Sequence, residues 1–593
     1  MRKVSPRLVA IMMAGAVTVT SITPVTGYQT ITVNAATDSQ EKEAAQGYQT
    51  NLTGFDYKKG DWKETKDGLY SNAVDKGDCF AFSKTTAKNF VYSTDVTFKR
   101  NQGAATLIFR SNNNLDNKEC YAVNIDGGSH KCKLWRWQEN SDYQLIDEKE
   151  VKATDDEKYT LKVVAYDSWI SYYVNDTLIA STGDYTLQKD DKGQSTVLTE
   201  GSLGLLNWNG EMTFQNTYYT ELNDQNTPEL KNISVSSSTG DVEKAAQFTS
   251  TEPIMIQYVK NNAETVDLNI EKKNKNADVQ VEYDGKIYND GKNIPVKVGK
   301  NYITVKSTVQ GENGQTATLT YRVNVHRRAA DKTYYNEAYR NQYHYSVKDG
   351  WGNDLNGLVK YKGTYHMFYQ FYDDTKWGPM HWAHATSKDL IHWEEQPIAL
   401  YPDANGAMFS GCIVADEKNT SGLFGDGNEG GLVALITADG NGQRIKVAYS
   451  TDEGKTWKKT NKIAADWSKD PLNNRDFRDP KVFRWENKWF MVIAGGPLRI
   501  YSSDNLTDWK CESTYADLHT ECPDLYPIET KDGVKWVLSR GGRFYKVGDF
   551  KQVDGKWKFV ADEAYKNSDG VMNFGKDSYA AMTYYVQDFG TQE

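Results

Sequence analysis

Short runs in which apolar and polar residues alternate recur along most of the chain, and clusters of Gly, Asn and Asp separate them. Two examples are NFVYSTDVTF at 89–98 and NYITVKSTV at 301–309. A period of two with β-branched and aromatic side chains is typical of strands that bury one face. Helical periodicity of any length is hard to find. The pattern therefore predicts an all-β protein.

The first group of strands occupies residues 47–222. Within it, SWISYYV at 168–174 and TLIAS at 177–181 flank Asn175-Asp176, a pair that suits a two-residue hairpin turn. So many short antiparallel strands predict a jelly-roll sandwich.

A second group follows the linker LNDQNTPEL at 222–230. Residues 228–327 alternate clearly, contain few aromatic residues and hold no cluster of residue types suited to catalysis. We expect a small immunoglobulin-like sandwich and call this unit the spacer.

A degenerate repeat marks the third region, residues 335–593, where Trp is dense. TSKDLIHW, YSTDEGKTW and YSSDNLTDW each place a Ser two residues before an Asp, with a Trp four or five residues after that Asp. The serines are Ser387, Ser450 and Ser502, which are 63 and 52 residues apart. Each copy is expected to be a turn in which Asp caps its own backbone and Trp fills the space between sheets.

A repeat of this length in an all-β region predicts a β-propeller with four strands per blade. The 254 residues from 340 to the end suffice for four blades and part of a fifth. We therefore expect two sandwiches followed by a five-bladed propeller that is incomplete at its C-terminal end.

The first 35 residues contain no acid and place three basic residues ahead of an apolar run at 8–20. This order predicts a secretory signal peptide, and the run is too short and too interrupted for a membrane span. The protein is expected to be secreted or extracellular. Attachment to the cell surface through a part not present in this chain stays open.

The formal net charge of −10 disfavours binding to a polyanion, so no nucleic-acid partner is expected. No membrane span is expected in the mature chain, and the oligomeric state stays open. Six cysteines are too few for a disulfide scaffold at this length. Cys120 and Cys132 could pair around a hairpin or remain buried free thiols.

Three acidic residues of the third region stand in unusual settings: Asp354 in WGNDLNG, Asp479 in NRDFRDPKVF and Glu521 in LHTECPDLYP. The inner strands of propeller blades converge on an axis, so carboxylates of different blades can meet there. Glycoside hydrolysis needs such paired carboxylates. Each acid also has an ordinary explanation, because Asn-Asp before Gly is common in turns, RDP can start a strand, and a lone Glu before Cys signals nothing.

The order of motifs in this region resembles that of glycoside hydrolase family 32, the fructan hydrolases and invertases. QYHYSVKDGWGNDLNG resembles the opening motif of the family, and YHMFYQ, WGPMHWAHATSKDLIHW, FSGC, FRDP and EC follow in the family's order. FGKDSYAA resembles its late strand. The resemblance implies a retaining β-fructosidase that needs no cofactor.

The resemblance also implies roles for individual residues. Asp354 would be the nucleophile and Glu521 the general acid and then base, with a pKa raised by its setting. Asp479, helped by Arg478, would stabilise the transition state. The fructose subsite would be lined by Asn353, Leu355, Asn356, Gln370, Trp377, Phe409 and Ser410. Retention implies that the carboxyls of Asp354 and Glu521 lie about 5–5.5 Å apart.

The chain departs from the family pattern in three places. Leu355 stands where the family usually has proline, and Gly352 where it has a bulkier residue. Neither change removes a functional group, although both alter the backbone beside Asp354. The family also continues past residue 593 into a last blade and a further sandwich.

Two other features were weighed as sites. His381 and His384 lie three residues apart in an expected strand, hence on opposite faces, without a Cys or acid partner, so no metal is expected. SLGLLNWNGEMTFQNTYY resembles the closing strands of family 66 carbohydrate-binding modules. Trp135 and Trp137 of the same unit, on one strand face, are either core residues or a stacking platform for sugar.

The sequence thus favours a secreted glycosidase that removes terminal β-D-fructofuranosyl units from a fructan, levan or inulin rather than sucrose. Exo action is expected, since a propeller funnel suits chain ends. Two alternatives remain: an arabinan- or xylan-acting enzyme on the related propeller, and a fructan-binding protein without catalysis.

Overall fold

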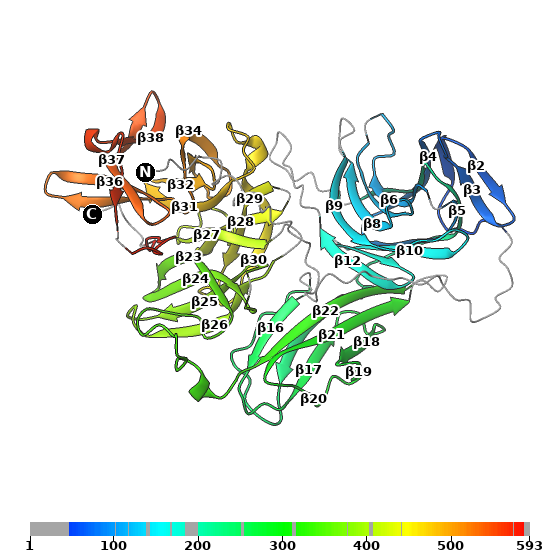
Figure 1. Cartoon of the computed structure of the whole chain (residues 1–593), viewed down its shortest axis with the longest axis horizontal. Coiled ribbons are helices and arrows are strands. Elements are labelled where there is room, and N and C mark those ends of the chain that lie inside the picture. The colour runs from blue at the N-terminus through cyan, green and yellow to red at the C-terminus, as the bar shows by residue number, and fades with distance from the viewer. Residues whose placement is uncertain are drawn as a thin grey trace, which may run out of the picture.

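The chain folds into three all-β units, as predicted. The computed structural model describes residues 47–585 except 101, 117, 138–142, 167–168, 184–197, 199, 251–253, 311–315, 376, 403–406, 441 and 573–574. The expected signal peptide lies outside the described residues. Figure 1 shows the three units in sequence, with the second lying between the other two. No helix among the described residues is long and apolar enough to cross a membrane.

The first unit is a sandwich of two seven-stranded sheets. One sheet runs in the order β1 (Phe55–Lys59), β4 (Asp78–Ala87), β13 (Gly201–Trp208), β6 (Ala104–Ser111), β7 (Cys120–Asp126), β8 (Lys131–Trp137) and β9 (Tyr143–Glu150). The other runs in the order β12 (Thr177–Gly183), β11 (Trp169–Val174), β10 (Lys158–Tyr166), β5 (Phe90–Arg100), β14 (Glu211–Glu221), β3 (Gly68–Asn72) and β2 (Trp62–Thr65). Alternate residues of both sheets form one apolar core.

Local predictions for this unit can be checked directly. β11 and β12 close on Asn175 and Asp176, which both have positive φ, so the two-residue hairpin is confirmed. Cys120 and Cys132 are buried free thiols; the other four cysteines are also free, and all of them except the half-buried Cys511 are buried. Trp135 and Trp137 are both half-buried; the Lys133 ammonium lies over the Trp135 ring, and Trp137 packs edge-on against Phe80.

The spacer is a smaller sandwich. Three strands, β15 (Leu230–Ser236), β17 (Thr265–Lys272) and β20 (Ile294–Pro295), form one sheet. The other contains, in order, β16 (Ile254–Val259), β22 (Thr316–Arg327), β21 (Gly299–Gln310), β18 (Asp278–Tyr283) and β19 (Lys286–Ile287). Its aliphatic inner faces form a separate core.

The third unit has four blades among the described residues. Blade 1 contains β23 (Trp351–Tyr361), β24 (Thr364–Tyr372), β25 (His381–Ser387) and β26 (Trp393–Leu400), and blade 2 contains β27 (Ala407–Asp416), β28 (Gly431–Gly440), β29 (Gly442–Ser450) and β30 (Lys458–Asp466). Blade 3 contains β31 (Arg478–Trp485), β32 (Lys488–Ala494), β33 (Pro497–Ser503) and β34 (Lys510–His519), and blade 4 contains β35 (Asp524–Thr530), β36 (Gly533–Arg540), β37 (Phe544–Val553) and β38 (Lys556–Ala561), with β39 (Gly570–Val571) paired to β37. Short 3-10 helices span Asp331–Thr333, Trp467–Lys469 and Glu563–Tyr565.

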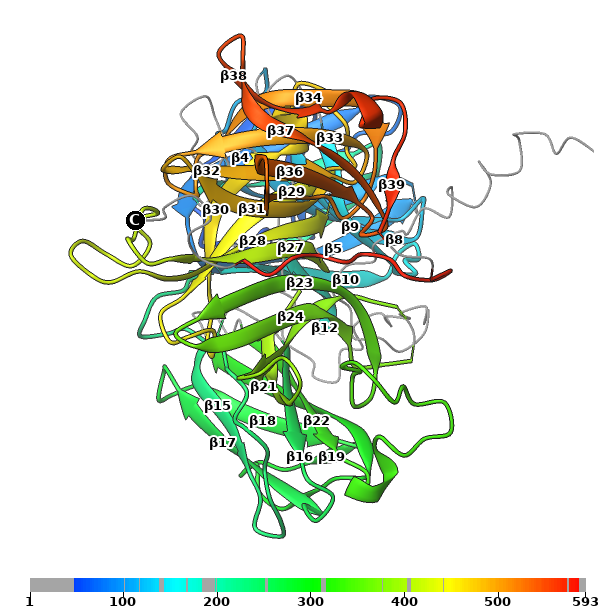
Figure 2. The ribbon, with the colours of Figure 1, turned by 90° about the vertical axis from the view of Figure 1, so that its left-hand side faces the viewer.

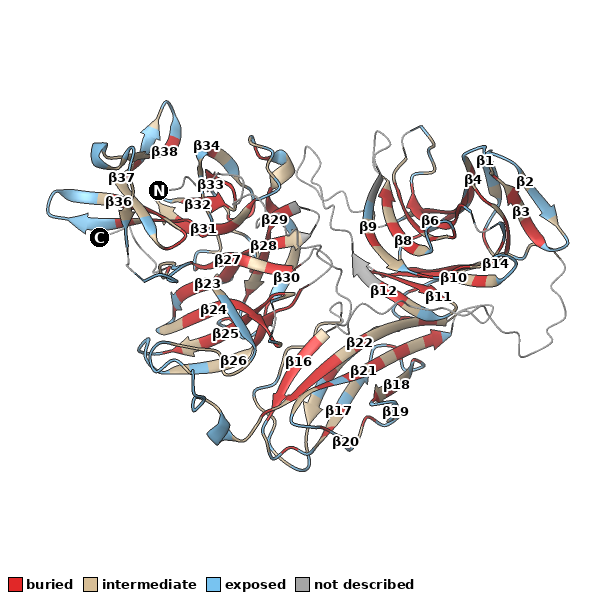
Figure 3. Cartoon of the chain, in the orientation of Figure 1, coloured by how far each residue is buried: buried red, intermediate tan, exposed pale blue. Residues whose placement is uncertain are grey.

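The first strand of each blade lies toward the centre. β27 lies against both β23 and β31, and β31 lies against β35. Of these inner strands, β27 and β31 are mostly buried, as their red ribbon in Figure 3 shows. The four inner strands therefore bring residues from distant parts of the sequence to one axis.

The repeat occupies the same place in three blades, between the third and fourth strands. In blades 1 and 2 the aspartates cap the turn as predicted: Asp389 accepts from the amide of His392 at 2.8 Å, and Asp452 accepts from that of Thr456 at 2.9 Å. In blade 3 the prediction was wrong by one residue. Ser503 and Asn505 make the turn, and Asn505 accepts from the amide of Asp508 at 2.9 Å. An Asn side chain can cap a turn as Asp does, which is why the register was misplaced.

A segment after blade 4 joins the last blade to the first. The amide of Tyr585 donates to the carbonyl of Leu358 at 2.8 Å, and the amide of Lys360 donates back at 3.2 Å. On its other side, the amide of Thr583 donates to Asp524 of β35 at 2.7 Å. Figure 2 shows this red segment running along β23. We call residues 579–585 the closing segment.

Candidate active site

Asp354 stands on an irregular strand rather than in a turn, so the turn suggested by WGNDLNG was wrong. In β23, Gly352 pairs with Phe371 but Leu355 pairs with Tyr369, which leaves Asn353 and Asp354 in a β-bulge. A bulge re-aims side chains at the edge of a ladder. A Cβ on Gly352 would come within 2.8 Å of the Val347 side chain, which accounts for glycine at this position. Glycine is favoured both in turns and in bulges, so its presence in WGNDLNG does not distinguish the two.

A chain of hydrogen bonds fixes the carboxylate of Asp354. The Asn353 amide donates to Gln370 at 2.9 Å, and Gln370 donates to the Ser410 hydroxyl at 2.7 Å. Ser410 in turn donates to Asp354 Oδ2 at 2.8 Å. Gln370 and Ser410 are buried, so β24 and β27 hold the acid of β23 from two blades. Burial raises the pKa of Asp354, the charge of Glu521 raises it further, and the bond from Ser410 opposes both.

Asp479 is the most buried of the three acids, with 4% of its surface exposed. Its φ of +61° is unusual for a residue other than glycine, and two bonds hold it there. Its own amide donates to Thr437 at 3.1 Å, and the amide of Cys522 donates to its carboxylate at 2.9 Å. Burial raises the pKa of Asp479 to about 6, and Asp354 and Glu521 add to this rise.

Glu521 lies in the connection between β34 and β35. Arg478 donates to one carboxylate oxygen at 2.6 Å, and the hydroxyl of Tyr579 donates to the other at 2.6 Å. Burial acts to raise the pKa of Glu521, but these two hydrogen bonds outweigh burial, so the pKa lies below its usual value. The expectation of a raised pKa is therefore wrong for this arrangement, because two donors stabilise the charged form.

Arg478 links the acids of blade 3 and the β34–β35 connection. Besides Glu521, its guanidinium lies 3.9 Å from Asp479 and donates to Gln443 at 3.1 Å. Together with Cys522, whose thiol lies 3.7 Å from Asp354, it ties all three acids into one cluster. The structure thus brings together Asp354, Asp479, Glu521 and Arg478 as the sequence predicted.

The remaining predicted residues lie around this cluster in different roles. Trp377 is 37% exposed, and its ring meets that of Phe409 edge-on at 5.6 Å. Asn356 is 1% exposed, and with its amide oxygen turned inward it accepts from Trp382 at 2.9 Å and from the Gln370 amide at 3.1 Å. Leu355 packs against the apolar cluster of blade 1. Asn356 and Leu355 thus support the wall of the site, while Trp377 stands at its edge.

Three residues at the cluster carried no predicted role: Tyr579, Cys522 and Gln443. Tyr579 lies in the quoted motif FGKDSYAA, so the signal was present, but its pairing with Glu521 depends on the closing segment. Cys522 is buried, and its amide also binds Asp479. Gln443 lies in no motif that singles it out.

No group of metal-ligating side chains occurs among the residues that the structure describes. His384 instead contacts His366, with 3.1 Å between their ring nitrogens, and His381 contacts the Pro379 carbonyl at 3.0 Å. The acids and donors of the cluster are the groups available for chemistry. They suit a reaction at an acetal carbon, with one carboxylate to attack and another to move a proton.

Comparison with known proteins divides the chain as follows. Residues 344–591 match the glycosyl hydrolases family 32 N-terminal domain. Residues 47–219 match a 3-keto-alpha-glucoside-1,2-lyase-like domain, and residues 230–328 match a cadherin-like beta sandwich domain.

Two relatives carry names that state an activity. A fructan beta-fructosidase of Streptococcus mutans is 68% identical over 90% of this chain and 38% of its own length. A levanase of Bacillus subtilis is 42% identical over 43% of this chain and 40% of its own length. The chain thus spans about two fifths of either relative. A solved structure of the carbohydrate-binding module CBM66 from Bacillus subtilis is 27% identical over 29% of this chain and 98% of that one, with a TM-score of 0.26.

Proposed function

We propose that the chain, whose residues 344–591 match the N-terminal domain of glycosyl hydrolases family 32, hydrolyses terminal β-D-fructofuranosyl linkages of fructans. The observation that carries the proposal is the cluster of Asp354, Asp479 and Glu521 tied together by Arg478 and Cys522. The names of the two relatives, a fructan beta-fructosidase and a levanase, support the substrate class.

The reaction would proceed in two displacements. In the first, an Asp354 oxygen attacks C2 of the terminal fructosyl unit, the bond from C2 to the linking oxygen breaks, and Glu521 gives its proton to that oxygen. In the second, Glu521 takes a proton from water, the water oxygen bonds to C2, and Asp354 departs. Two inversions give net retention.

The other residues of the cluster would act by position and charge. Ser410 orients Asp354 through Oδ2, and Oδ1, which accepts only a long bond from Asn353 at 3.4 Å, would attack. Asp479 is buried, and it is held by the Thr437 hydroxyl and the Cys522 amide. Its carboxylate would accept hydrogen bonds from fructose hydroxyls as positive charge develops at C2. Arg478 neutralises part of the negative charge of the three acids.

Product analysis tests the proposal. Incubation with levan or inulin is expected to release fructose as the first product, with the β-anomer appearing before mutarotation in an NMR time course. Release of arabinose or xylose from arabinan or xylan would instead support the related propeller glycosidases. Binding to levan without any turnover would identify a fructan-binding protein. Sucrose is expected to be a poorer substrate than the polymers.

The pH dependence should follow the lowered pKa of Glu521. Because a general acid must be protonated, kcat/KM is expected to fall as pH rises through that pKa. The Tyr579→Phe variant loses a donor to the carboxylate, so the pKa of Glu521 rises and the alkaline limb of the kcat/KM profile moves to higher pH. Initial rates across a pH series measure this shift.

Tyr584→Phe is the matched control, since it removes a hydroxyl from the same closing segment, and that hydroxyl has no hydrogen-bond partner among the residues that the structure describes. Its profile should stay that of the original chain. An alkaline limb that stays in place or moves downward in Tyr579→Phe would contradict the assignment of Glu521 as the acid.

We also propose that the protein is secreted, since a polymeric substrate must be met outside the cell.

A further inference from the structure

A buried guanidinium joins the spacer to blade 1. Arg328 directly follows β22 and is 2% exposed. It donates to Glu395 of β26 at 2.9 Å and to Asp349 at 3.2 Å, and its guanidinium lies 3.8 Å from the centre of the Tyr258 ring. A planar guanidinium with several partners fixes both sides of a contact in direction as well as distance.

A second cation of the spacer reaches the same blade at another point. Lys300 of β21 places its ammonium 3.6 Å from Asp374 and 3.9 Å from Asp373. Asp373 is largely buried. Burial raises the pKa of Asp373, and the charge of Lys300 opposes that rise. Lys300 therefore favours the charged form of a carboxylate that desolvation disfavours.

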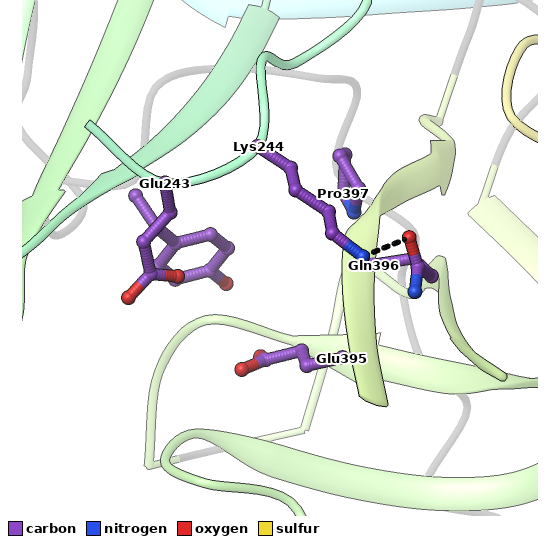
Figure 4. Close-up of a pocket in the computed structure, with 6 residues that line it drawn as sticks. Glu243, Lys244, Glu395, Gln396 and Pro397 are labelled. Carbon is purple, nitrogen blue, oxygen red and sulfur yellow. Dashed lines mark hydrogen bonds between the residues drawn. The ribbon is translucent and has the colours of Figure 1, made fainter. Parts of the chain in front are cut away.

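Between these contacts the two units pack without a break. Ile256 and Tyr258 of β16 belong to the same apolar cluster as Met367 and Tyr369 of β24. A cavity of about 210 Å³ lies beside this cluster, with Glu243 and Lys244 facing Glu395 and Gln396. Figure 4 shows the bond that crosses it, from Lys244 to Gln396 at 2.8 Å. The spacer and blade 1 thus share a continuous interface.

Both anchored acids flank the strands that carry the site. Asp349 lies five residues before Asp354, just ahead of β23, and Asp373 directly follows β24, three residues after Gln370. Trp351 pairs with Tyr372, so the two acids lie at the same end of this hairpin. Trp377 follows four residues after Asp373. Arg328 and Lys300 of the spacer therefore contact blade 1 at the end of the β23–β24 hairpin that lies beside the active site.

We propose that the spacer is part of the active-site wall, with Arg328 and Lys300 as positioning residues that hold the bulge of Asp354 and the ring of Trp377 for the fructosyl chain. This inference rests on the proposed function for its kinetic readout. Lys300 would act through Asp373 and Asp374 on Trp377, and Arg328 through Asp349 on β23. The spacer would then set how tightly a fructan is held rather than only separating two other units.

Lys300→Met is the variant of choice, because Arg328 is buried among carboxylates and its removal would leave them unpaired. A partly exposed ion pair contributes only modestly, so the KM for a fructan oligosaccharide of defined length is expected to rise about 1.4- to fivefold. The kcat should stay within about twofold, and Lys300→Arg should restore KM. A merely structural loss would lower the active fraction, and so kcat, without changing KM.

Lys306→Met is the matched control, since Lys306 lies on the same strand and pairs with Glu282 inside the spacer at 3.2 Å. It should leave KM unchanged. A second readout needs no activity: amide hydrogen exchange in a peptide spanning 370–381 should quicken in Lys300→Met and not in Lys306→Met. In a Trp377→Ala background, Lys300→Met should add no further rise in KM.

Different failures have different meanings. If the original chain releases no fructose from any fructan, the proposed function fails, and the exchange experiment still decides the inference. If the original chain is active but Lys300→Met changes neither KM nor exchange, the inference is overturned. A loss confined to kcat, or an additive effect with Trp377→Ala, would also overturn it.

Discussion

Replacing Asp354 with Asn is expected to lower kcat on levan by on the order of 10⁴-fold or more, because an amide cannot form the fructosyl-enzyme bond. The fold should survive. Burial already disfavours the charge of Asp354, and an Asn oxygen can still accept from Ser410. The melting temperature is therefore expected to stay the same or to rise. Steady-state kinetics and thermal unfolding of the same preparation provide both measurements.

Asp504→Asn serves as the control for this change, because Asp504 lies on an exposed turn of blade 3 and pairs with Lys488 at 2.7 Å. It should keep full activity. Azide supplies a sharper test with Asp354→Ala, since an external nucleophile that takes the vacated place yields α-fructosyl azide by single inversion. Substantial turnover by Asp354→Asn without azide would show that another group attacks.

Replacing Glu521 with Ala is expected to lower kcat by about 10²–10⁴-fold, because both proton transfers lose their carboxylate. Azide needs no base, so it should speed the second displacement by attacking the fructosyl-Asp354 intermediate, while the first displacement still lacks its acid. The product would then be β-fructosyl azide, the opposite anomer from that given by Asp354→Ala. The anomer is identified by NMR, and it separates the two carboxylates by role and not only by loss of rate.

Glu529→Gln, at an exposed position of β35, is the companion control and should behave as the original chain does. The α-azide from Glu521→Ala would contradict the assignment. The 5–5.5 Å separation expected between the carboxyls of Asp354 and Glu521 stays a prediction. Retained stereochemistry of the natural product is its chemical counterpart.

The strands and the repeat were predictable because each leaves a local mark on the sequence. Alternation located the strands, and the positions of Ser387 and Ser450 located equivalent turns in two blades. The predicted position of the third turn was wrong by one residue, because Asn505 caps the turn in place of Asp504. The bulge of β23 was mistaken for a turn because glycine and asparagine favour both, and only the partner strand distinguishes them.

The site was predictable in its membership but not in its electrostatics. The order of motifs named Asp354, Asp479, Glu521 and Arg478, and the structure brings them together. The pKa of Glu521 depends on a bond from Tyr579, 58 residues away, which no local pattern announces. The spacer contacts of Lys300 were invisible for the same reason, since complementary charges on separate units have no fixed spacing in the sequence.

The closing segment sets the order in which this molecule can mature during synthesis. Tyr585 bonds to Leu358, 227 residues earlier, and the Tyr579 hydroxyl reaches Glu521 from the same segment. Contacts between such distant residues form late and slowly, because a long loop must close first. When all three acids have left the ribosome but the closing segment has not, the first and last blades are still unconnected. Glu521 then still lacks its hydrogen bond from Tyr579. The chemistry of the protein would be switched on only once this segment has emerged and closed on β23.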